Sequence, residues 1–327
     1  MLGQQPGPVL GFDIGGTKLA TGVVTPDGKV HGFVVEPTYA DAGPDVVISR
    51  LFDLGRRSVE IAGLGSPELI GIACGGPLDS GKGIVQCPPH LPGWIDIPLV
   101  AKAEEAFGVP AFLENDATAA ALGEACFGAG AGAQSLVYLT ISTGIGGGVV
   151  INGRLHRGAT GNGGELGHVT VRPGGRRCDA DGRQGCLEAY CSGTNIAARA
   201  RDAVSSALAA GRSTTLAGID PLTAADVTCA AAAGDAVASE VWRETTDLLG
   251  QGLTDIVNVL EPEVVVLGGG VTRSGNMLLD PVTKVIRAGV LGPEAQAVRI
   301  HLAGLGDEVG VVGAAAVAWD RTSNQAN

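Results

Sequence analysis

A ten-residue segment near the N-terminus reads VLGFDIGGTK, and its residue types suit phosphate chemistry. An apolar run leads to Asp13, and Gly15 and Gly16 then let the main chain turn and bring its N–H groups close to a ligand. A concave run of N–H groups binds phosphate, and a carboxylate at a strand end suits the Mg²⁺ that accompanies a nucleotide. The order of Thr17 and Lys18 excludes a Walker loop, in which lysine comes first. A plain β-hairpin turn is the alternative.

A second candidate is the sequence Glu114-Asn115-Asp116, which follows a short apolar run and precedes an Ala-rich segment. A strand that ends here and a helix that begins here would present the acid at a sheet edge. Asp116 could then accept the proton of an alcohol that attacks a phosphoryl group. Asparagine and aspartate are also preferred helix N-caps, so a capping role is the alternative.

A third candidate is the hydroxyl- and glycine-rich segment at residues 140–148. Thr143 is followed by Gly144 and three further glycines, which is more than a two-residue hairpin requires. The segment predicts a second cradle for the outer phosphates of a nucleotide, with a Gly-rich hairpin as the alternative.

Soft metal ligands gather in a fourth region. Glu165 and His168 would lie on the same side of one helical turn. His168, Cys178 and Cys186 are three of the four ligands that a structural zinc needs, and Glu188 follows them closely. Buried cysteines of no chemical role are the alternative, because the paired Cys-x-x-Cys pattern of many zinc sites is absent.

The elements that must position these residues alternate between strands and helices. Strands are expected at 9–12, 20–24, 30–35, 69–73, 111–113, 135–142, 147–151 and 264–267, and helices at 45–62, 99–107, 117–127, 194–208, 223–233, 236–259 and 311–318. This alternation predicts an α/β protein with mainly parallel sheets covered on both faces. A strand followed by glycines recurs at 9–16, 137–148 and 264–270, which indicates two related lobes that offer loops to a central cleft.

Composition narrows the function. The 327 residues suffice for two domains, and 45% hydrophobic residues exclude a disordered chain. A net charge of −12 argues against nucleic acid or an anionic membrane as the main partner. Seven cysteines, an odd number, fit a reducing compartment. No targeting segment or membrane span is visible, so a cytoplasmic protein is expected.

In their order and spacing, these motifs resemble the ROK family of sugar kinases, and within it the bacterial glucokinases, along nearly the whole chain. The segments that carry the resemblance are Asp13-Ile-Gly-Gly-Thr-Lys18, Gly76-Pro-Leu-Asp79, Glu114-Asn-Asp-Ala117, Ser142-Thr-Gly-Ile-Gly-Gly-Gly148, Gly164-Glu-Leu-Gly-His168, Gly185-Cys-Leu-Glu188 and Val266-Leu-Gly-Gly-Gly270.

The resemblance implies a two-lobed actin-like ATPase fold, of the RNase H-like type, with a central cleft. We expect a small lobe at residues 1–117 plus about 305–327 and a large lobe at 118–304. The implied reaction is the ATP-dependent phosphorylation of a hexose, most simply glucose, at its 6-hydroxyl. The implied cofactors are ATP, Mg²⁺ and a structural Zn²⁺, and the implied assembly is a homodimer or homotetramer.

The resemblance also assigns roles to residues. Asp116 would be the general base toward the 6-hydroxyl. The hexose hydroxyls would be held by Gly76, Asn115, Asp116, Glu165, His168 and Glu188. The nucleotide and its Mg²⁺ would be bound by Asp13, acting through water, and by Gly15, Gly16, Thr17, Lys18, Thr143, Gly144 and Gly269.

The chain departs from the family pattern in two places. Family members usually carry Cys-x-Cys-Gly-x-x-Gly-Cys, but the run from Cys178 to Cys186 lacks the middle cysteine, and Asp181 stands near its position. We expect zinc to be bound by His168, Cys178 and Cys186 with Asp181 as the fourth ligand, since a carboxylate can replace a thiolate. The second departure is His90, where the family often has asparagine; it is either a surface-loop residue or an altered sugar contact.

Other functions remain open at this stage. A kinase for N-acetylmannosamine, fructose or allose would share the motifs. Polyphosphate as the donor would favour a basic groove, which 34 acidic against 22 basic residues do not suggest. A sugar-binding repressor needs a helix-turn-helix domain before the first motif, and Asp13 lies too close to the start for one. A structural ATPase of this fold would not need Glu165, His168 and Glu188 together.

Overall fold

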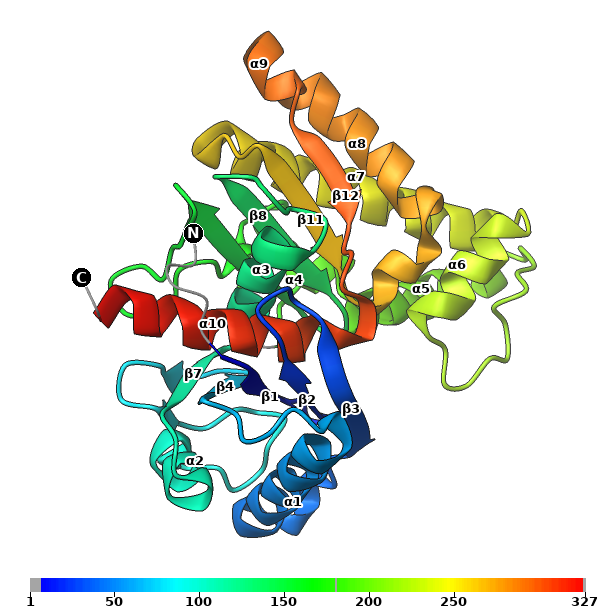
Figure 1. Cartoon of the computed structure of the whole chain (residues 1–327). Coiled ribbons are helices and arrows are strands. Elements are labelled where there is room, and N and C mark those ends of the chain that lie inside the picture. Colours follow the sequence, from blue (N-terminus) through cyan, green and yellow to red (C-terminus); the bar gives the residue numbers. More distant parts are fainter. Residues whose placement is uncertain (1–6, 180, 326–327) are drawn as a thin grey trace. The chain divides into compact units, whose positions relative to one another are not determined.

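A computed structural model describes residues 7–179 and 181–325 of the chain, which divides into two compact units (Figure 1). The first unit comprises residues 1–134, 148–163 and 303–327, and the second comprises 135–147 and 164–302. The small lobe expected from the sequence, 1–117 plus about 305–327, lies within the first unit, which also takes 118–134 and 148–163.

The first unit is built on a mixed sheet with the strand order β3-β2-β1-β4-β7. Its elements are β1 (Val9–Ile14), β2 (Lys18–Val24), β3 (Val30–Pro37), η1 (Ala40–Ala42), α1 (Pro44–Ala62), β4 (Leu69–Cys74), β5 (Leu78–Asp79), β6 (Ile84–Val85), α2 (Leu99–Phe107), β7 (Ala111–Asn115), α3 (Asp116–Phe127), β10 (Arg154–Leu155), η4 (Gly306–Glu308) and α10 (Val309–Gln325). The strands β1, β4 and β7 run parallel, whereas β1, β2 and β3 are antiparallel. The expectation of mainly parallel strands is therefore met only by half of this sheet, because the short turns after β1 and β2 require antiparallel neighbours.

Each face of this sheet is covered by apolar side chains and a helix. Leu10, Phe12 and Ile14 of β1 point into a core with residues of α1 and α2, while Val9 points into a second core with α10. Figure 1 shows α10 on one face of the strands and α1 on the other. The alternation along β1 follows from the two-residue period of a strand.

Helix α10 approaches the sheet closely because small residues face it. A Cβ placed on Gly71 of β4 would lie 1.9 Å from the main-chain oxygen of Ala314. Helix α3 also packs on α10, and a Cβ on Gly123 would lie 3.0 Å from the Cα of Gly313. This packing explains why α3 belongs to the first unit although the sequence analysis placed its residues in the large lobe.

The second unit carries the strands β8, β11 and β12, which run parallel to one another. Its elements are β8 (Leu136–Ile141), η2 (Leu166–His168), α4 (Glu188–Cys191), α5 (Gly193–Ala209), α6 (Ala224–Ala232), α7 (Ala236–Leu260), β11 (Val264–Gly268), η3 (Gly270–Ser274), α8 (Asn276–Gly289), α9 (Gly292–Gln296) and β12 (Arg299–Leu302). The boundary between the units falls inside β9 (Ile145–Ile151), and the sheet has the order β10-β9-β8-β11-β12.

Helix α8, which lies between the expected strand at 264–267 and the expected terminal helix, was not predicted from the sequence. Pro281 lies inside this helix and argues against one, but Leu278, Val282 and Ile286 recur every four residues and are fully buried. Burial of that stripe outweighs the unfavourable proline. Among the described residues no helix is both long and apolar enough to cross a membrane.

Candidate active site

The turn between β1 and β2 is a tight hairpin with Gly16 and Thr17 at its tip. The N–H of Gly15 donates to the carbonyl oxygen of Lys18 at 3.0 Å. Neither Gly15 nor Gly16 has a positive φ, so a left-handed backbone does not explain why glycine is required there. Instead, a Cβ on Gly16 would lie 2.8 Å from the Cβ of His90. The glycine is needed because another segment passes close to the turn.

Asp13 lies near the end of β1, against the first turn of α10. A Cβ on Gly310 would lie 2.3 Å from the carboxyl carbon of Asp13. Burial, and to a lesser extent the nearby charge of Asp116, raise the pKa of Asp13 to about 6, while Lys18 acts in the opposite direction. The two carboxylates are thus close enough to repel each other, an arrangement that a bound cation would relieve.

Asn115 and Asp116 lie where β7 passes into α3. Asn115 pairs with Cys74 across β4 and β7, and its Oδ1 accepts hydrogen bonds from the N–H groups of Ala117 and Thr118 at 3.0 and 3.1 Å. Asn115 is therefore the helix N-cap. Asp116 follows it with an exposed side chain, so its carboxylate is presented to solvent at the end of the strand.

The residue before this pair is held by a buried ion-pair cluster. Glu114 is 1% exposed, and its Oε2 accepts a 2.6 Å hydrogen bond from Nε of Arg157. Arg321 of α10 lies 3.5 Å from the same oxygen, and Arg157 also pairs with Asp320 at 3.2 Å. A buried carboxylate needs such partners, and together they fix the chain immediately before Asn115.

His90 is half-buried between two loops of the first unit. A Cβ on Gly75 would lie 2.6 Å from its Nε2. Burial lowers the pKa of His90, and the charge of Asp116 acts in the opposite direction. His90 therefore lies within electrostatic reach of the candidate base. Gly76 is nearby as well, since a Cβ on it would lie 3.7 Å from Nδ2 of Asn115.

In the second unit, the turn between β8 and β9 is shorter than the glycine count suggests. The N–H of Ser142 donates to the carbonyl oxygen of Gly144 at 2.9 Å, and β9 begins at Ile145. Gly147 lies inside the strand, where a Cβ would be 2.6 Å from the carbonyl oxygen of Gly164. Close packing, rather than a long loop, accounts for this glycine, and only Ser142–Gly144 remain as a cradle.

Glu188 opens helix α4 and faces this turn. Its Oε2 accepts a 2.6 Å hydrogen bond from the N–H of Ile145, and a Cβ on Gly144 would lie 2.6 Å from the same oxygen. Its Oε1 accepts from Sγ of Cys178 at 3.4 Å. The structure thus brings Gly144, Glu188 and the cysteine region together.

His168, Cys178 and Cys186 offer ligand atoms that all lie within 4.8 Å of one another, and both cysteines are buried. Nδ1 of His168 is buried and makes no hydrogen bond, although a carboxylate oxygen of Asp181 lies 3.0 Å away. Glu165 lies 3.8 Å from the other ring nitrogen. An unpaired buried nitrogen beside two thiols and a carboxylate fits the donor set of a structural zinc.

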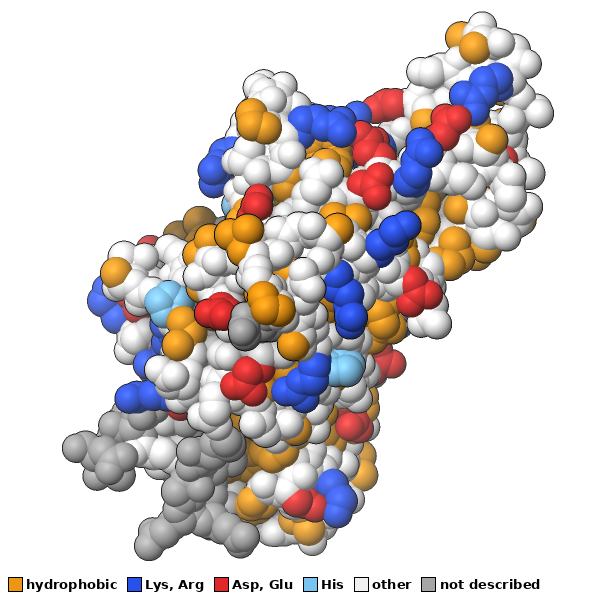
Figure 2. All heavy atoms as spheres, turned by 90° about the horizontal axis from the view of Figure 1, so that it is seen from above, with side chains coloured by type: hydrophobic (Ala, Val, Ile, Leu, Met, Phe, Trp, Pro, Cys, Tyr) orange, Lys and Arg blue, Asp and Glu red, His pale blue; other side chains and the backbone are white. Residues whose placement is uncertain are grey.

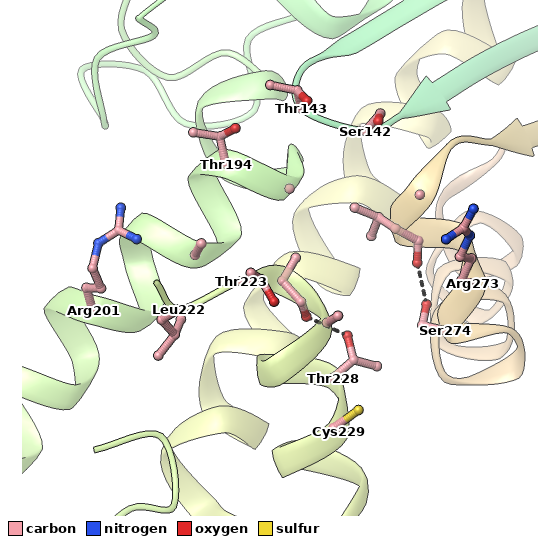
Figure 3. A pocket seen from close by; sticks show the side chains of 16 residues that line it. Ser142, Thr143, Thr194, Arg201, Leu222, Thr223, Thr228, Cys229, Arg273 and Ser274 are labelled. Atoms are coloured by element: carbon pink, nitrogen blue, oxygen red, sulfur yellow. Dashed lines mark hydrogen bonds between the residues drawn. The ribbon is translucent and has the colours of Figure 1, made fainter. Parts of the chain in front are cut away.

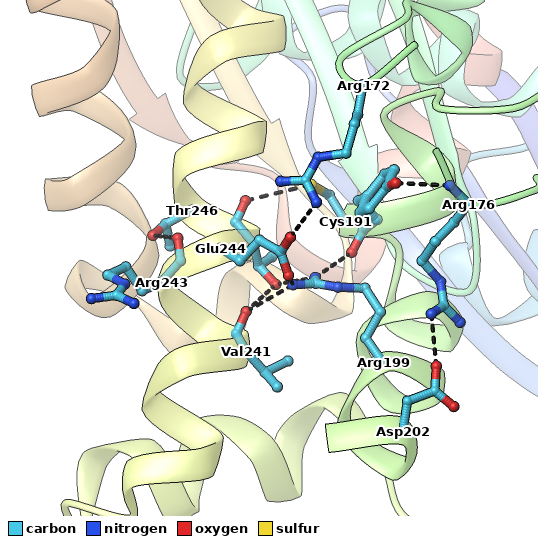
Figure 4. A network of polar contacts seen from close by, with 11 residues as sticks. Arg172, Arg176, Cys191, Arg199, Asp202, Val241, Arg243, Glu244 and Thr246 are labelled. Atoms are coloured by element: carbon cyan, nitrogen blue, oxygen red, sulfur yellow. Dashed lines mark hydrogen bonds and ion pairs between the residues drawn. The ribbon is translucent and has the colours of Figure 1, made fainter. Parts of the chain in front are cut away.

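A polar network connects helix α4 to α5 and α7 (Figure 4). Arg199 of α5 is 5% exposed and donates to the carbonyl oxygen of Tyr190 at 2.9 Å and to Oγ1 of Thr245 at 2.8 Å. It also pairs with Glu244 of α7. The Tyr190 hydroxyl accepts from the N–H of Arg176 at 2.7 Å. These bonds fix the segment that bears Glu188.

A cavity of about 680 Å³ opens in the second unit (Figure 3). Its wall comes from the β8–β9 turn, the start of α5, the start of α6 and the 3₁₀ turn η3. The lining includes Ser142, Thr143, Gly193, Thr194, Ala197, Arg201, Leu222, Thr223, Thr228, Cys229, Gly270, Val271, Arg273 and Ser274. Gly269 precedes η3 with φ 89°, where a Cβ would lie 2.5 Å from the carbonyl oxygen of Ile141.

Thr143 and Gly269 near this cavity were predicted from the sequence as nucleotide-binding residues, whereas the lining residues from α5 and α6 were not. Those residues carry no motif, and only the packing of four segments that are far apart in sequence brings the lining together. Among the described residues, the expected site residues of the first unit gather around Asp13 and Asp116, and those of the second gather around His168 and the Ser142–Gly144 turn.

The chain is similar to known proteins along nearly its whole length. The family model described as the ROK family matches residues 9–321. The glucokinase of Thermotoga maritima is 33% identical over 313 residues, covering 96% of this chain and 98% of that protein. The crystal structure of a ROK hexokinase from Thermus thermophilus superposes with a TM-score of 0.80 at 38% identity, covering 97% of this chain and 99% of that chain.

The chain therefore belongs to the ROK family. A ROK family glucokinase from Streptomyces griseus, crystallised in complex with glucose and AMPPNP, is also similar, with a TM-score of 0.78, 33% identity and coverage of 95% of this chain and 99% of that chain. The two-lobed actin-like ATPase fold expected from the sequence is confirmed by these neighbours.

Proposed function

We propose that this protein is an ATP-dependent hexokinase that phosphorylates glucose at its 6-hydroxyl. The observation that carries the proposal is the exposed carboxylate of Asp116 at the start of α3, beside Asp13, whose pKa is raised to about 6. The family membership and the similarity to glucokinases support the same reaction. The cytoplasm is the proposed location.

In the proposed mechanism, Asp116 accepts the proton of the sugar hydroxyl as the hydroxyl oxygen attacks the γ-phosphorus of ATP. The bond between this phosphorus and the β,γ-bridging oxygen breaks, and ADP leaves. Asn115, with Gly76, Glu165, His168 and Glu188, holds the other hydroxyls of the sugar. A site that bonds every hydroxyl rejects isomers that would leave its polar groups unpaired. Mg²⁺, when bound near Asp13 through water, supplies the charge that offsets the phosphates.

The phosphates of ATP are assigned to the main-chain N–H groups of two turns. The first is Gly15, Gly16, Thr17 and Lys18, in which the N–H of Gly15 closes the turn on Lys18 and Gly16 and Thr17 would present their N–H groups to phosphate. The second is Thr143 and Gly144. We assign the adenosine end to the 680 Å³ cavity that follows Gly269. Ala197, Leu222 and Val271 give this cavity an apolar wall, which suits a purine and which a polyphosphate donor would not need. In the view of Figure 2, basic and acidic side chains of the described residues are interspersed.

Zinc is assigned to His168, Cys178, Asp181 and Cys186, where the metal would fix the orientation of His168 toward the sugar. Metal analysis of the purified protein should find about one zinc per chain. Asp181→Ala should lower this content, Asp181→Cys should restore it, and Asp179→Ala, a change at a neighbouring exposed aspartate, should leave it unchanged. A zinc content near zero in the unaltered protein would refute the assignment.

Phosphorylation rates with Mg²⁺ and ATP across a hexose panel test the function. The panel contains glucose, N-acetylmannosamine, fructose and allose, and polyphosphate replaces ATP in a parallel series. We expect the highest kcat/KM with glucose and ATP. If another hexose is preferred, we assign the altered specificity to His90, which stands where the family often has asparagine. Sugar binding without any phosphorylation would indicate a regulator instead.

We also propose that the protein is a homodimer or homotetramer, and light scattering of the purified protein would measure its mass in solution.

A further inference from the structure

A buried threonine outside every motif braces the turn between β1 and β2. Thr38 follows β3 and is fully buried. Its Oγ1 donates a 2.6 Å hydrogen bond to the carbonyl oxygen of Gly15, and its N–H donates to the carbonyl oxygen of Thr17 at 3.0 Å. One residue thus holds the turn on both sides of Gly16.

Helix α1 fixes Thr38 in turn through a single arginine. Arg50 donates from Nη1 to the carbonyl oxygen of Thr38 and from Nη2 to that of Pro37, each at 2.9 Å. Its guanidinium also lies 3.4 Å from Glu36 and 4.7 Å from the ring centre of Tyr39. The segment that carries Thr38 is therefore anchored by several bonds to one side chain.

We propose that Thr38 is a positioning residue for nucleotide binding, which holds the Gly15–Thr17 turn in the shape that presents the main-chain N–H groups of Gly16 and Thr17 to phosphate. This inference rests on the function proposed above for the turn. Thr38 itself is fully buried, so it acts on the nucleotide through the turn. A side chain of the same shape without the hydroxyl would leave the carbonyl oxygen of Gly15 without its donor, so the turn would lose its fixed shape.

The same substitution at two buried threonines separates this role from a general packing role. Thr21 lies on β2 in the same sheet and is also fully buried, but its Oγ1 makes no hydrogen bond. We expect Thr38→Val to raise the KM for ATP about tenfold and to change the KM for glucose by less than about twofold. Thr38→Ser should restore the KM for ATP, and Thr21→Val should leave both constants unchanged.

A second pair of variants keeps the test decisive if Thr38→Val does not fold. Arg50 and Arg56 both lie on α1, each pairs with one carboxylate, and each lies over one aromatic ring. Only Arg50 reaches the main chain at Thr38. Arg50→Met should therefore raise the KM for ATP in the same direction, and Arg56→Met should not.

Calorimetric binding of MgADP to each variant provides a readout that does not depend on turnover, and the loss of affinity should match the rise in the KM for ATP. One contrary result is an active unaltered enzyme in which Thr38→Val and Arg50→Met leave the affinity for nucleotide unchanged, or weaken the affinity for glucose equally. This result overturns the inference about Thr38 and leaves the proposed function intact. An unaltered protein that consumes no ATP with any sugar contradicts the proposed function instead.

Discussion

At the scale of single residues, the central feature of the first unit is that Asn115 and Asp116 have different roles. Asn115 is the N-cap of α3. The capping role that the sequence offered as an alternative for Asp116 therefore belongs to its neighbour. The carboxylate of Asp116 is left exposed at the strand end. This is the geometry that a general base toward an incoming alcohol requires.

Asp116→Asn tests this role directly, because the amide keeps the size of the side chain and cannot accept the proton. We expect kcat to fall by about 10²–10⁴-fold, while glucose still binds with nearly normal affinity in calorimetry. Asp45→Asn is the matched control, since Asp45 also stands in the first turn of a helix of the same unit and is exposed. Near-normal turnover of Asp116→Asn would reject the assignment.

Asp13 should make stability depend on pH in an unusual direction. Burial and the charge of Asp116 raise its pKa from 3.8 to about 6 in the folded chain. The folded state therefore holds this proton more tightly than the unfolded state, so the ionised side chain costs stability as the pH rises from about 4 through 6.

Asp13→Asn should consequently stabilise the metal-free protein against urea by about 1–3 kcal/mol at pH 7, and by less at pH 5. Its kinase activity should fall, since the carboxylate is proposed to act toward Mg²⁺. The exposed Asp41 provides the control, because Asp41→Asn should change stability little at either pH. A stabilisation by Asp13→Asn that grows toward acid pH would contradict the raised pKa.

At the scale of elements, the contact between β4 and α10 depends on the absence of a side chain at Gly71. A Cβ there would lie 1.9 Å from the main-chain oxygen of Ala314, and a helix backbone in a core cannot move aside cheaply. We expect Gly71→Ala to lower the free energy of unfolding by about 3 kcal/mol or more.

Gly81→Ala is the matched change in the same unit. Its φ is not positive, and the nearest atom to its Cβ is a side-chain oxygen of Asp79 at 3.4 Å. Urea unfolding should place this variant within about 0.5 kcal/mol of the unaltered chain. Equal stability of the two variants would show that α10 does not rest on β4 as described.

The elements also show what sequence reasoning can and cannot reach. Helix α2 has the bounds that its pattern predicted, and the acids and glycines at the ends of β1, β7 and β11 were found because their order is informative along the chain. No sequence motif marks Thr38, because the pairing of β2 with β3 is what brings it close to its partners Gly15 and Thr17. The cavity lining of α5 and α6 was missed for the same reason, because side chains far apart in sequence form it.

At the scale of the whole molecule, the residues proposed for the two substrates are divided differently between the units. The residues proposed to hold the hexose include Asn115 and Asp116, which belong to the first unit, and Glu165, His168 and Glu188, which belong to the second. The cavity proposed for adenosine is lined by residues of the second unit. The two ligands should therefore stabilise different parts of the chain, because a ligand stabilises the structure to which it binds.

Hydrogen exchange followed by mass spectrometry of peptides can measure this difference. Glucose at about 100 times its Kd should slow exchange in peptides of both units, around 113–118 and 165–188, because binding adds about 2.7 kcal/mol to the opening of the segments it holds. Adenosine should slow exchange around 193–201, 222–229 and 270–274 and leave 113–118 unchanged. Protection by glucose confined to the second unit would show that Asn115 and Asp116 do not hold the sugar, and the assignment of Asp116 as its base would then fail. Protection confined to the first unit would instead refute the proposed contacts of Glu165, His168 and Glu188.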